Sequence, residues 1–96
     1  MRIKDRTRVL LPALLSLLIL APSCTRSPEV RKSRYLEAGR RLYDQKDYPR
    51  AILEFKNAMD VAHGDPEPSY RLGLAYFAAN DIKQAAAAFS NAARLN

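Results

Sequence analysis

Two stretches decide the fold: residues 39–59, GRRLYDQKDYPRAILEFKNAM, and residues 73–93, GLAYFAANDIKQAAAAFSNAA. They match at one constant offset without a gap, and the matching positions are Gly39/Gly73, Asp47/Asp81, Ala51/Ala85, Phe55/Phe89 and Ala58/Ala92. Same-type matches at one offset indicate an internal repeat. A repeat of 34 residues, the distance from Gly39 to Gly73, holds two helices. Two helices cannot bury an apolar face alone and therefore stack on neighbours. The sequence predicts an all-α array with an extended surface suited to holding another protein.

In the first copy, two helices are predicted on either side of a tight turn. Apolar residues recur at three- and four-residue spacing within residues 34–46 and again within residues 51–62, as on one face of a helix. Asp47 is a suitable N-cap for the second helix, and Pro49 falls in its first turn, where a missing N–H costs little.

The second copy repeats these signals. Asp65 precedes Pro66, an arrangement typical of an N-cap followed by the first helical position. Asn80 tolerates the left-handed conformation at a helix end, and Asp81 can cap the helix that follows. The chain is therefore expected to form four helices.

The small matching residues have a structural explanation. Gly39 and Gly73 let paired helices approach closely, and Phe55 and Phe89 fill the space left between them. Each ring is expected to contribute roughly 2–3 kcal/mol by burial. The alanines keep the second helix of each pair close to the first; they are Ala51, Ala58, Ala85 and Ala92.

This spacing resembles two tetratricopeptide repeats, over about residues 32–64 and 65–96. Tyr35, Ala38 and Leu42 stand where the family often has Trp, Leu and Tyr. The resemblance implies binding of proteins or peptides on the concave surface, which the first helix of each pair lines. It gives these groove candidates: Leu36, Arg40, Tyr43, Asp44, Glu67, Tyr70, Leu74 and Phe77. The Lys/Asn/Arg clamp of one subfamily is not expected, because Leu36 and Arg40 occupy two of its places.

Residues 1–23 resemble a secretory signal peptide. Four basic residues precede an apolar run over residues 9–21, and the sequence Ala21-Pro22-Ser23-Cys24 follows. The run is too short for a permanent membrane span. Cys24 resembles the lipidated cysteine of bacterial lipoproteins, although Ala21 stands where those usually have Leu. Cleavage by the ordinary peptidase before Cys24 is the alternative, and it would leave a free thiol.

If Cys24 carries lipid, Thr25 bears on the location of the protein. By resemblance, an Asp at this place retains lipoproteins at the inner membrane, so Thr25 favours the outer membrane, facing the periplasm. Residues 24–31 contain Ser27, Pro28 and several charges, which predicts a short flexible spacer between anchor and repeats.

The net charge of +6 falls to +3 without residues 1–23, which contain four of the 16 basic residues and one of the ten acidic residues. The remaining excess clusters at Arg26, Arg31, Lys32, Arg34, Arg40 and Arg41. It is interpreted as a solvated tether and an ordinary helix face, with attraction to anionic lipid or an acidic partner as the alternative. Nucleic-acid binding is not expected, because no basic-aromatic pattern lies on a sheet.

No catalytic or metal-binding set can be assembled from this composition. The single histidine, His63, falls near a helix end, where it suits the helix dipole. Cys24 is the only cysteine, so metal ligands are lacking, and the three glycines form no phosphate-binding loop. We expect no cofactor and no enzyme activity.

Two repeats are few for a stable array. The sequence given stops at Asn96 without a polar capping helix, so an open C-terminal face is expected, to be covered by a longer array, a homodimer or a partner. The leading hypothesis is a lipid-anchored adaptor of the bacterial envelope, similar to repeat lipoproteins of pilus, outer-membrane or exopolysaccharide assembly. The alternatives are the N-terminal module of a longer secreted enzyme and a soluble periplasmic protein that self-associates.

Overall fold

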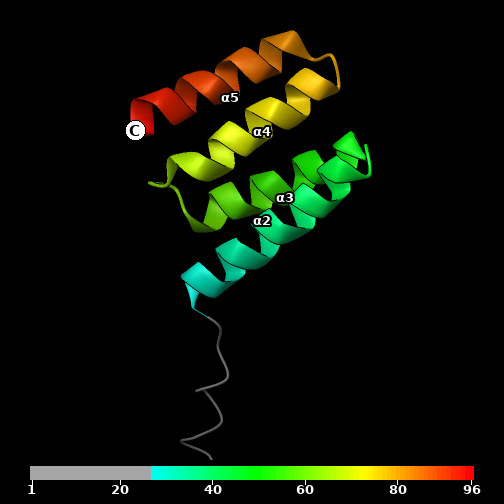
Figure 1. The fold of residues 1–96 in the computed structure, drawn as a ribbon. Coiled ribbons are helices and arrows are strands. Elements are labelled where there is room, and N and C mark those ends of the chain that lie inside the picture. Colours follow the sequence, from blue (N-terminus) through cyan, green and yellow to red (C-terminus); the bar gives the residue numbers. More distant parts are fainter. Residues whose placement is uncertain (1–26) are drawn as a thin grey trace, which may run out of the picture.

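The computed structural model describes residues 27–96, and these form four helices without a strand. They are α2 (Pro28–Asp44), α3 (Tyr48–Val61), α4 (Pro66–Ala78) and α5 (Ile82–Leu95). α2 packs on α3 and α4 on α5, so each copy of the repeat is a hairpin, and α4 packs on α3 to join the two hairpins. Figure 1 shows the helices following one another in chain order. The prediction of an all-α array of paired helices is confirmed.

Aspartates cap three of the four helices, as the sequence predicted. Asp47 accepts a hydrogen bond from the backbone N–H of Arg50 at 3.3 Å, and Asp65 accepts one from the N–H of Glu67 at 2.9 Å. Asp81 caps α5 in the same way through the N–H of its third following residue. Each carboxylate satisfies one of the N–H groups that have no partner inside the helix.

The start of α2 differs from the sequence prediction. The prediction of a flexible spacer through residue 31 is wrong for residues 28–31, which are helical. The Ser27 hydroxyl accepts from the N–H of Val30 at 3.3 Å, Pro28 takes the first helical position, and Glu29 places an acid in the positive first turn. The predicted signal peptide, residues 1–23, and Cys24 lie outside the described residues.

The two hairpin turns have the same geometry. Lys46 and Asn80, which occupy equivalent positions in the two copies, have positive φ values of 62° and 64°. The N–H of Lys46 bonds to the carbonyl of Tyr43 at 2.9 Å, and the next N–H bonds to the carbonyl of Leu42 at 2.8 Å. The Asn80 turn has the same two bonds, so both helices end in a Schellman motif. The predicted left-handed cap at Asn80 is confirmed, and Lys46 adopts it as well.

The core lies where the phenylalanines cross the glycines. Phe55 is 1% exposed, and a methyl group on Gly39 would lie 2.6 Å from its Cδ1 atom. A methyl on Gly73 would lie equally close to Cδ1 of Phe89. Only glycine allows this approach without a shift of the ring. The buried cluster around Phe55 draws on all four helices and consists of Leu36, Ala51, Phe55, Ala58, Leu72, Ala75 and Ala88.

Polar contacts also connect the two hairpins. Ser69 is fully buried in α4, where its hydroxyl donates to the sulfur of Met59 at 3.3 Å and accepts from the Asn91 amide at 2.6 Å. These three residues belong to α4, α3 and α5, so the buried hydroxyl is satisfied by both neighbouring helices.

An ion pair links the first turns of α2 to the connection before α4. Lys32 Nζ lies 2.8 Å from Asp65 Oδ2 and 3.1 Å from Glu29 Oε2. The hydrogen bond from Lys32, followed by that from the Glu67 N–H, lowers the pKa of Asp65. The same contact with Asp65, followed by that with Glu29, raises the pKa of Lys32. Both ions are therefore favoured in the folded state.

Candidate functional site: the concave surface

The first feature of the surface is a small cavity between α2 and α4, which are the first helices of the two hairpins. We call it the α2–α4 cavity. Its volume is about 140 Å³, and its lining residues are Arg40, Tyr43, Asp44, Phe55, Arg71 and Leu74. Four of them are predicted groove residues, contributed by α2 and α4. The structure therefore brings half of the predicted groove together in one place, across two different repeats.

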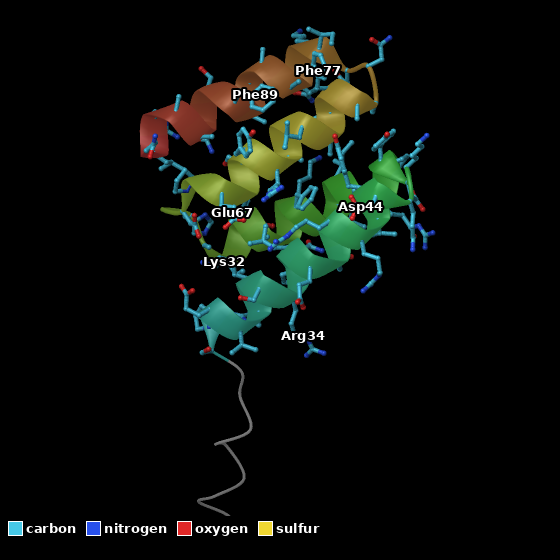
Figure 2. The ribbon with its side chains drawn as sticks, in the orientation of Figure 1. Lys32, Arg34, Asp44, Glu67, Phe77 and Phe89 are labelled. Atoms are coloured by element: carbon cyan, nitrogen blue, oxygen red, sulfur yellow. The ribbon has the colours of Figure 1, made fainter. Side chains whose placement is uncertain are left out.

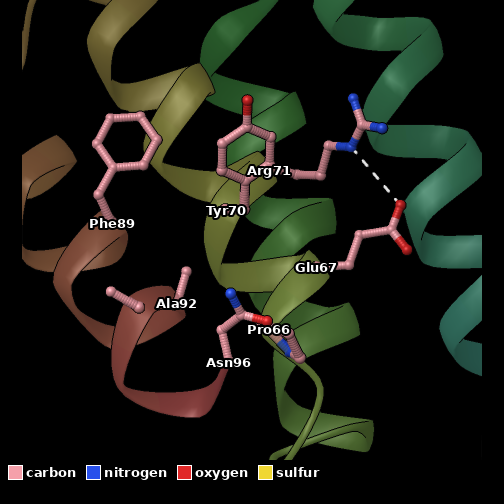
Figure 3. A pocket seen from close by; sticks show the side chains of 8 residues that line it. Pro66, Glu67, Tyr70, Arg71, Phe89, Ala92 and Asn96 are labelled. Atoms are coloured by element: carbon pink, nitrogen blue, oxygen red, sulfur yellow. Dashed lines mark ion pairs between the residues drawn. The ribbon is translucent and has the colours of Figure 1, made fainter.

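The second feature is a wider and more open pocket between the last two helices, which we call the α4–α5 pocket. Its volume is about 520 Å³, and its lining residues are Pro66, Glu67, Tyr70, Arg71, Phe89, Ala92, Ala93 and Asn96. Figure 3 shows Glu67, Tyr70 and Arg71 on α4 and Phe89 on α5. Glu67 and Tyr70 are predicted groove residues, so this pocket continues the concave surface beyond the α2–α4 cavity.

Arg71 lines both of these hollows, and the sequence prediction missed it. Its Nε atom lies 3.7 Å from Glu67 Oε1, an ion pair that Figure 3 marks with a dashed line. That separation is too long for a hydrogen bond, and Nε is buried with no other acceptor among residues 27–96. The spacing of Glu67 and Arg71, four residues apart on one helix, was the available signal in the sequence.

Two predicted groove residues lie elsewhere. Leu36 is only 3% exposed, so its assignment to the groove is wrong: it belongs to the buried cluster that also contains Phe55 and Leu72. Phe77 is 61% exposed near the end of α4 and lines neither hollow. Figure 2 shows Phe77 far from Glu67, near the turn into α5.

Aromatic pairs position the two tyrosines of the surface. The Tyr43 ring meets Tyr48 edge-on, with centroids 5.4 Å apart, and the Tyr70 ring lies 5.9 Å from that of Phe89. The first pair has the edge-to-face arrangement that aromatic rings prefer, and the second pair is tilted. Tyr43 is half-buried and Tyr70 is 49% exposed, so both present apolar area that a ligand can cover.

Residues 27–96 contain no group of His, Cys, Asp and Glu side chains placed to hold a metal ion, and His63 is exposed in the turn before α4. None of their helices combines the length and apolar character needed to cross a membrane.

The helices are paired and stacked in chain order, and two hollows lie beside α4. This arrangement defines a helical-repeat protein with a binding surface. The chain matches the tetratricopeptide repeat family over residues 42–95, more than half of its length, and belongs to that family. Repeats of this family are interaction modules that commonly bind protein partners. Neither the curated proteins nor the solved structures contain a match to the chain.

Proposed function

We propose that this protein is a non-catalytic adaptor of the bacterial cell envelope, held to the membrane by lipid on Cys24 and binding a partner protein on its concave surface. The α2–α4 cavity is the observation that carries the binding function. Its tyrosine, leucine and arginine side chains are the residue types that extended peptides and helices use as contacts in grooves.

The membrane anchor is supported by the sequence around Cys24. Cys24 follows the apolar run and lies three residues before Ser27, the cap of α2. Three residues span at most about 10 Å, so an acylated Cys24 would hold the start of α2 near the membrane surface. Confinement to the membrane raises the effective concentration of the surface for any membrane-bound partner. Because Thr25 rather than Asp follows Cys24, the anchored protein is placed at the outer membrane in this proposal.

Mass spectrometry and membrane fractionation of C-terminally tagged protein test the anchor, with Cys24→Ser as the comparison. The expected result is a mature chain that starts at Cys24 with added acyl groups, and release of the variant from the membrane. Unmodified wild-type protein in the soluble fraction would contradict the anchor and leave the binding function standing.

Substitution of both surface tyrosines tests the binding function. Tyr43→Ala with Tyr70→Ala is expected to abolish partner capture by in vivo crosslinking while the helical circular dichroism signal is retained. Lys83→Ala, on the exposed side of α5 and outside both hollows, is the control. Unchanged capture by the folded double variant would show that the partner binds elsewhere.

The open α4–α5 pocket favours self-association as a second candidate function. Tyr70 and Phe89 leave apolar area uncovered there, and a homodimer through this face would bury it. Sedimentation velocity distinguishes self-association from the binding of another protein. A wild-type dimer that becomes a monomer in the Ala93→Glu variant supports self-association, and a wild-type monomer contradicts it. A reading frame continuing into an enzyme domain after Asn96 would instead make the repeats its accessory module.

A further inference from the structure

We infer that the concave surface recognises an extended peptide with one carboxylate side chain between apolar residues, and that Arg71 binds this carboxylate. The inference rests on the proposed function, because it specifies the partner chemistry for the same surface. The observations that carry it are the unsatisfied Nε atom of Arg71, the place of Arg71 between two hollows, and the charges around it.

The Nε atom of Arg71 needs an acceptor that the described residues do not provide. It is buried, and the nearest carboxylate oxygen, Glu67 Oε1, is 3.7 Å away, beyond the range of about 2.7–3.2 Å for a hydrogen bond. A buried donor without an acceptor is unfavourable. A carboxylate matches a guanidinium best, because its two oxygens accept from two N–H groups at once. Nε is buried while the Arg71 side chain as a whole is 35% exposed, so a partner's carboxylate would first bind the exposed N–H groups of the guanidinium. It would reach Nε after a shift of the Glu67 side chain, which is 43% exposed.

The position of Arg71 fixes what must flank that carboxylate. Arg71 belongs to the lining of both hollows, so a ligand bound to it has an apolar site on either side. Neighbouring helices lie about 8–10 Å apart, and an extended peptide advances about 3.3 Å per residue. Apolar side chains two or three residues before and after the carboxylate therefore reach the two sites. The contacts offered are Tyr43, Phe55 and Leu74 on one side and Tyr70 and Phe89 on the other.

The charges of the surface select a single carboxylate rather than an acidic run. Arg40 adds a second cation in the α2–α4 cavity, and within residues 27–96 it has no ion pair. Asp44 and Glu67, however, add one anion to each hollow. A second or third acidic residue in the ligand would be repelled by them, so the attraction is local to the donor edge of Arg71. Because the peptide continues on both sides of α4, the carboxylate belongs to a side chain and not to a chain end.

A random heptapeptide library tests this specificity on the full-length protein in mild detergent. The peptides are displayed internally, with neither end free, so that only side-chain carboxylates can be selected. The consensus peptide is then synthesised with acetylated and amidated ends, as a Glu form and as a Gln form, and binding is measured by fluorescence anisotropy. The proteins compared are wild type, Arg71→Gln, Arg71→Lys and Arg34→Gln. Arg34 lines neither hollow, and Figure 2 shows it at the far edge of α2, so it is a matched loss of charge.

The expected consensus has one acidic position flanked by apolar residues, and wild type binds the Glu form about tenfold or more tightly than the Gln form. Arg71→Gln should bind both forms equally, Arg71→Lys should recover only part of the preference, and Arg34→Gln should keep all of it. Circular dichroism checks that each variant folds. A consensus without an acidic position, or a preference that persists in folded Arg71→Gln, would overturn the inference while leaving peptide binding in place. Selection of no peptide at all would overturn both the inference and the peptide-binding groove.

Discussion

The two hairpins carry the same sequence pattern in different surroundings. In the first, Leu36 and Phe55 are 3% and 1% exposed, because α4 packs on α3 and completes the cluster around them. At the equivalent positions of the second hairpin, Tyr70 is 49% exposed and Phe89 is half-buried beside an open pocket. Among the described helices, none covers α5 as α4 covers α3. Burial at a repeat position therefore depends on the next repeat as much as on the residue itself.

The largest expected difference between the hairpins is at the phenylalanines. Phe55→Ala should reduce the free energy of unfolding by about 3–5 kcal/mol, because it leaves a cavity in the buried cluster. Phe89→Ala should reduce it by about 1–2 kcal/mol, because the ring is only half-buried. Urea unfolding followed by circular dichroism measures both. Equal losses would mean that another molecule covers the α4–α5 pocket in solution.

The glycines facing these rings sharpen the same comparison. Gly39→Ala forces a methyl group against Phe55, which is enclosed, and should cost about 1–3 kcal/mol. At Gly73 the facing ring can move outward, and the gain of about 1 kcal/mol in helix propensity should leave stability nearly unchanged. Thermal unfolding of the two variants side by side checks the order. A larger loss at Gly73 than at Gly39 would contradict the contrast between closed and open hairpins.

The left-handed turn residues predict an opposite effect, a gain. Lys46→Gly should raise the free energy of unfolding by about 0.5–1 kcal/mol, because glycine adopts positive φ without the steric cost that lysine bears. This figure is a net gain, since the greater freedom of glycine in the unfolded chain offsets part of the benefit. Asn80→Gly should change stability less, since asparagine tolerates this conformation well. The midpoint of urea denaturation reports both changes. A loss at Lys46 would show instead that its side chain makes a contact that stabilises the turn.

The smallest effect concerns pH and the ion pair between α2 and the start of the second hairpin. The pKa of Asp65 is lowered in the folded state, so its contribution to stability is complete above the unfolded value of about 3.9 and disappears as pH falls through the folded value. Asp65→Asn keeps a cap but loses the pair with Lys32. It should be less stable than wild type at pH 7, and the two curves should converge at low pH. Asp81→Asn is the control, because among residues 27–96 this cap has no ion pair to another helix. A difference in stability between wild type and Asp65→Asn that stays constant at every pH would contradict this explanation.

Features set by local sequence were predictable. The caps at Asp47 and Asp81 and the left-handed Asn80 each depend on residues within one turn of the chain, and all three were found. The start of α2 was missed because Ser27 and Pro28 occur both in linkers and in N-caps, and no buried periodicity marks the first turns of this helix.

Features that depend on contacts between helices were harder to predict. The family resemblance placed Leu36 in the groove by its position, but its side chain lies in the core. The spacing of apolar residues along a helix does not tell which of them face the core and which face the groove. Arg71 was missed because its importance comes from lying between two hollows formed by several helices. Tyr43 and Leu74 were predicted to line the groove, but the cavity that they share forms only when α2 and α4 both pack on α3, which no single helix reveals.

The stacking of helices in chain order also determines how the protein folds. Each described helix packs on its immediate neighbour in sequence, so these contacts form without the closure of a long loop. Contacts of this kind allow folding in microseconds to milliseconds. Because α5 has a partner on one side only among the described helices, its amides should exchange with solvent faster than those of α3 and α4, through local opening of the last helix. α2 likewise packs on one helix only, so the α4–α5 pocket lies at one of the two ends of the array where local unfolding is expected to begin.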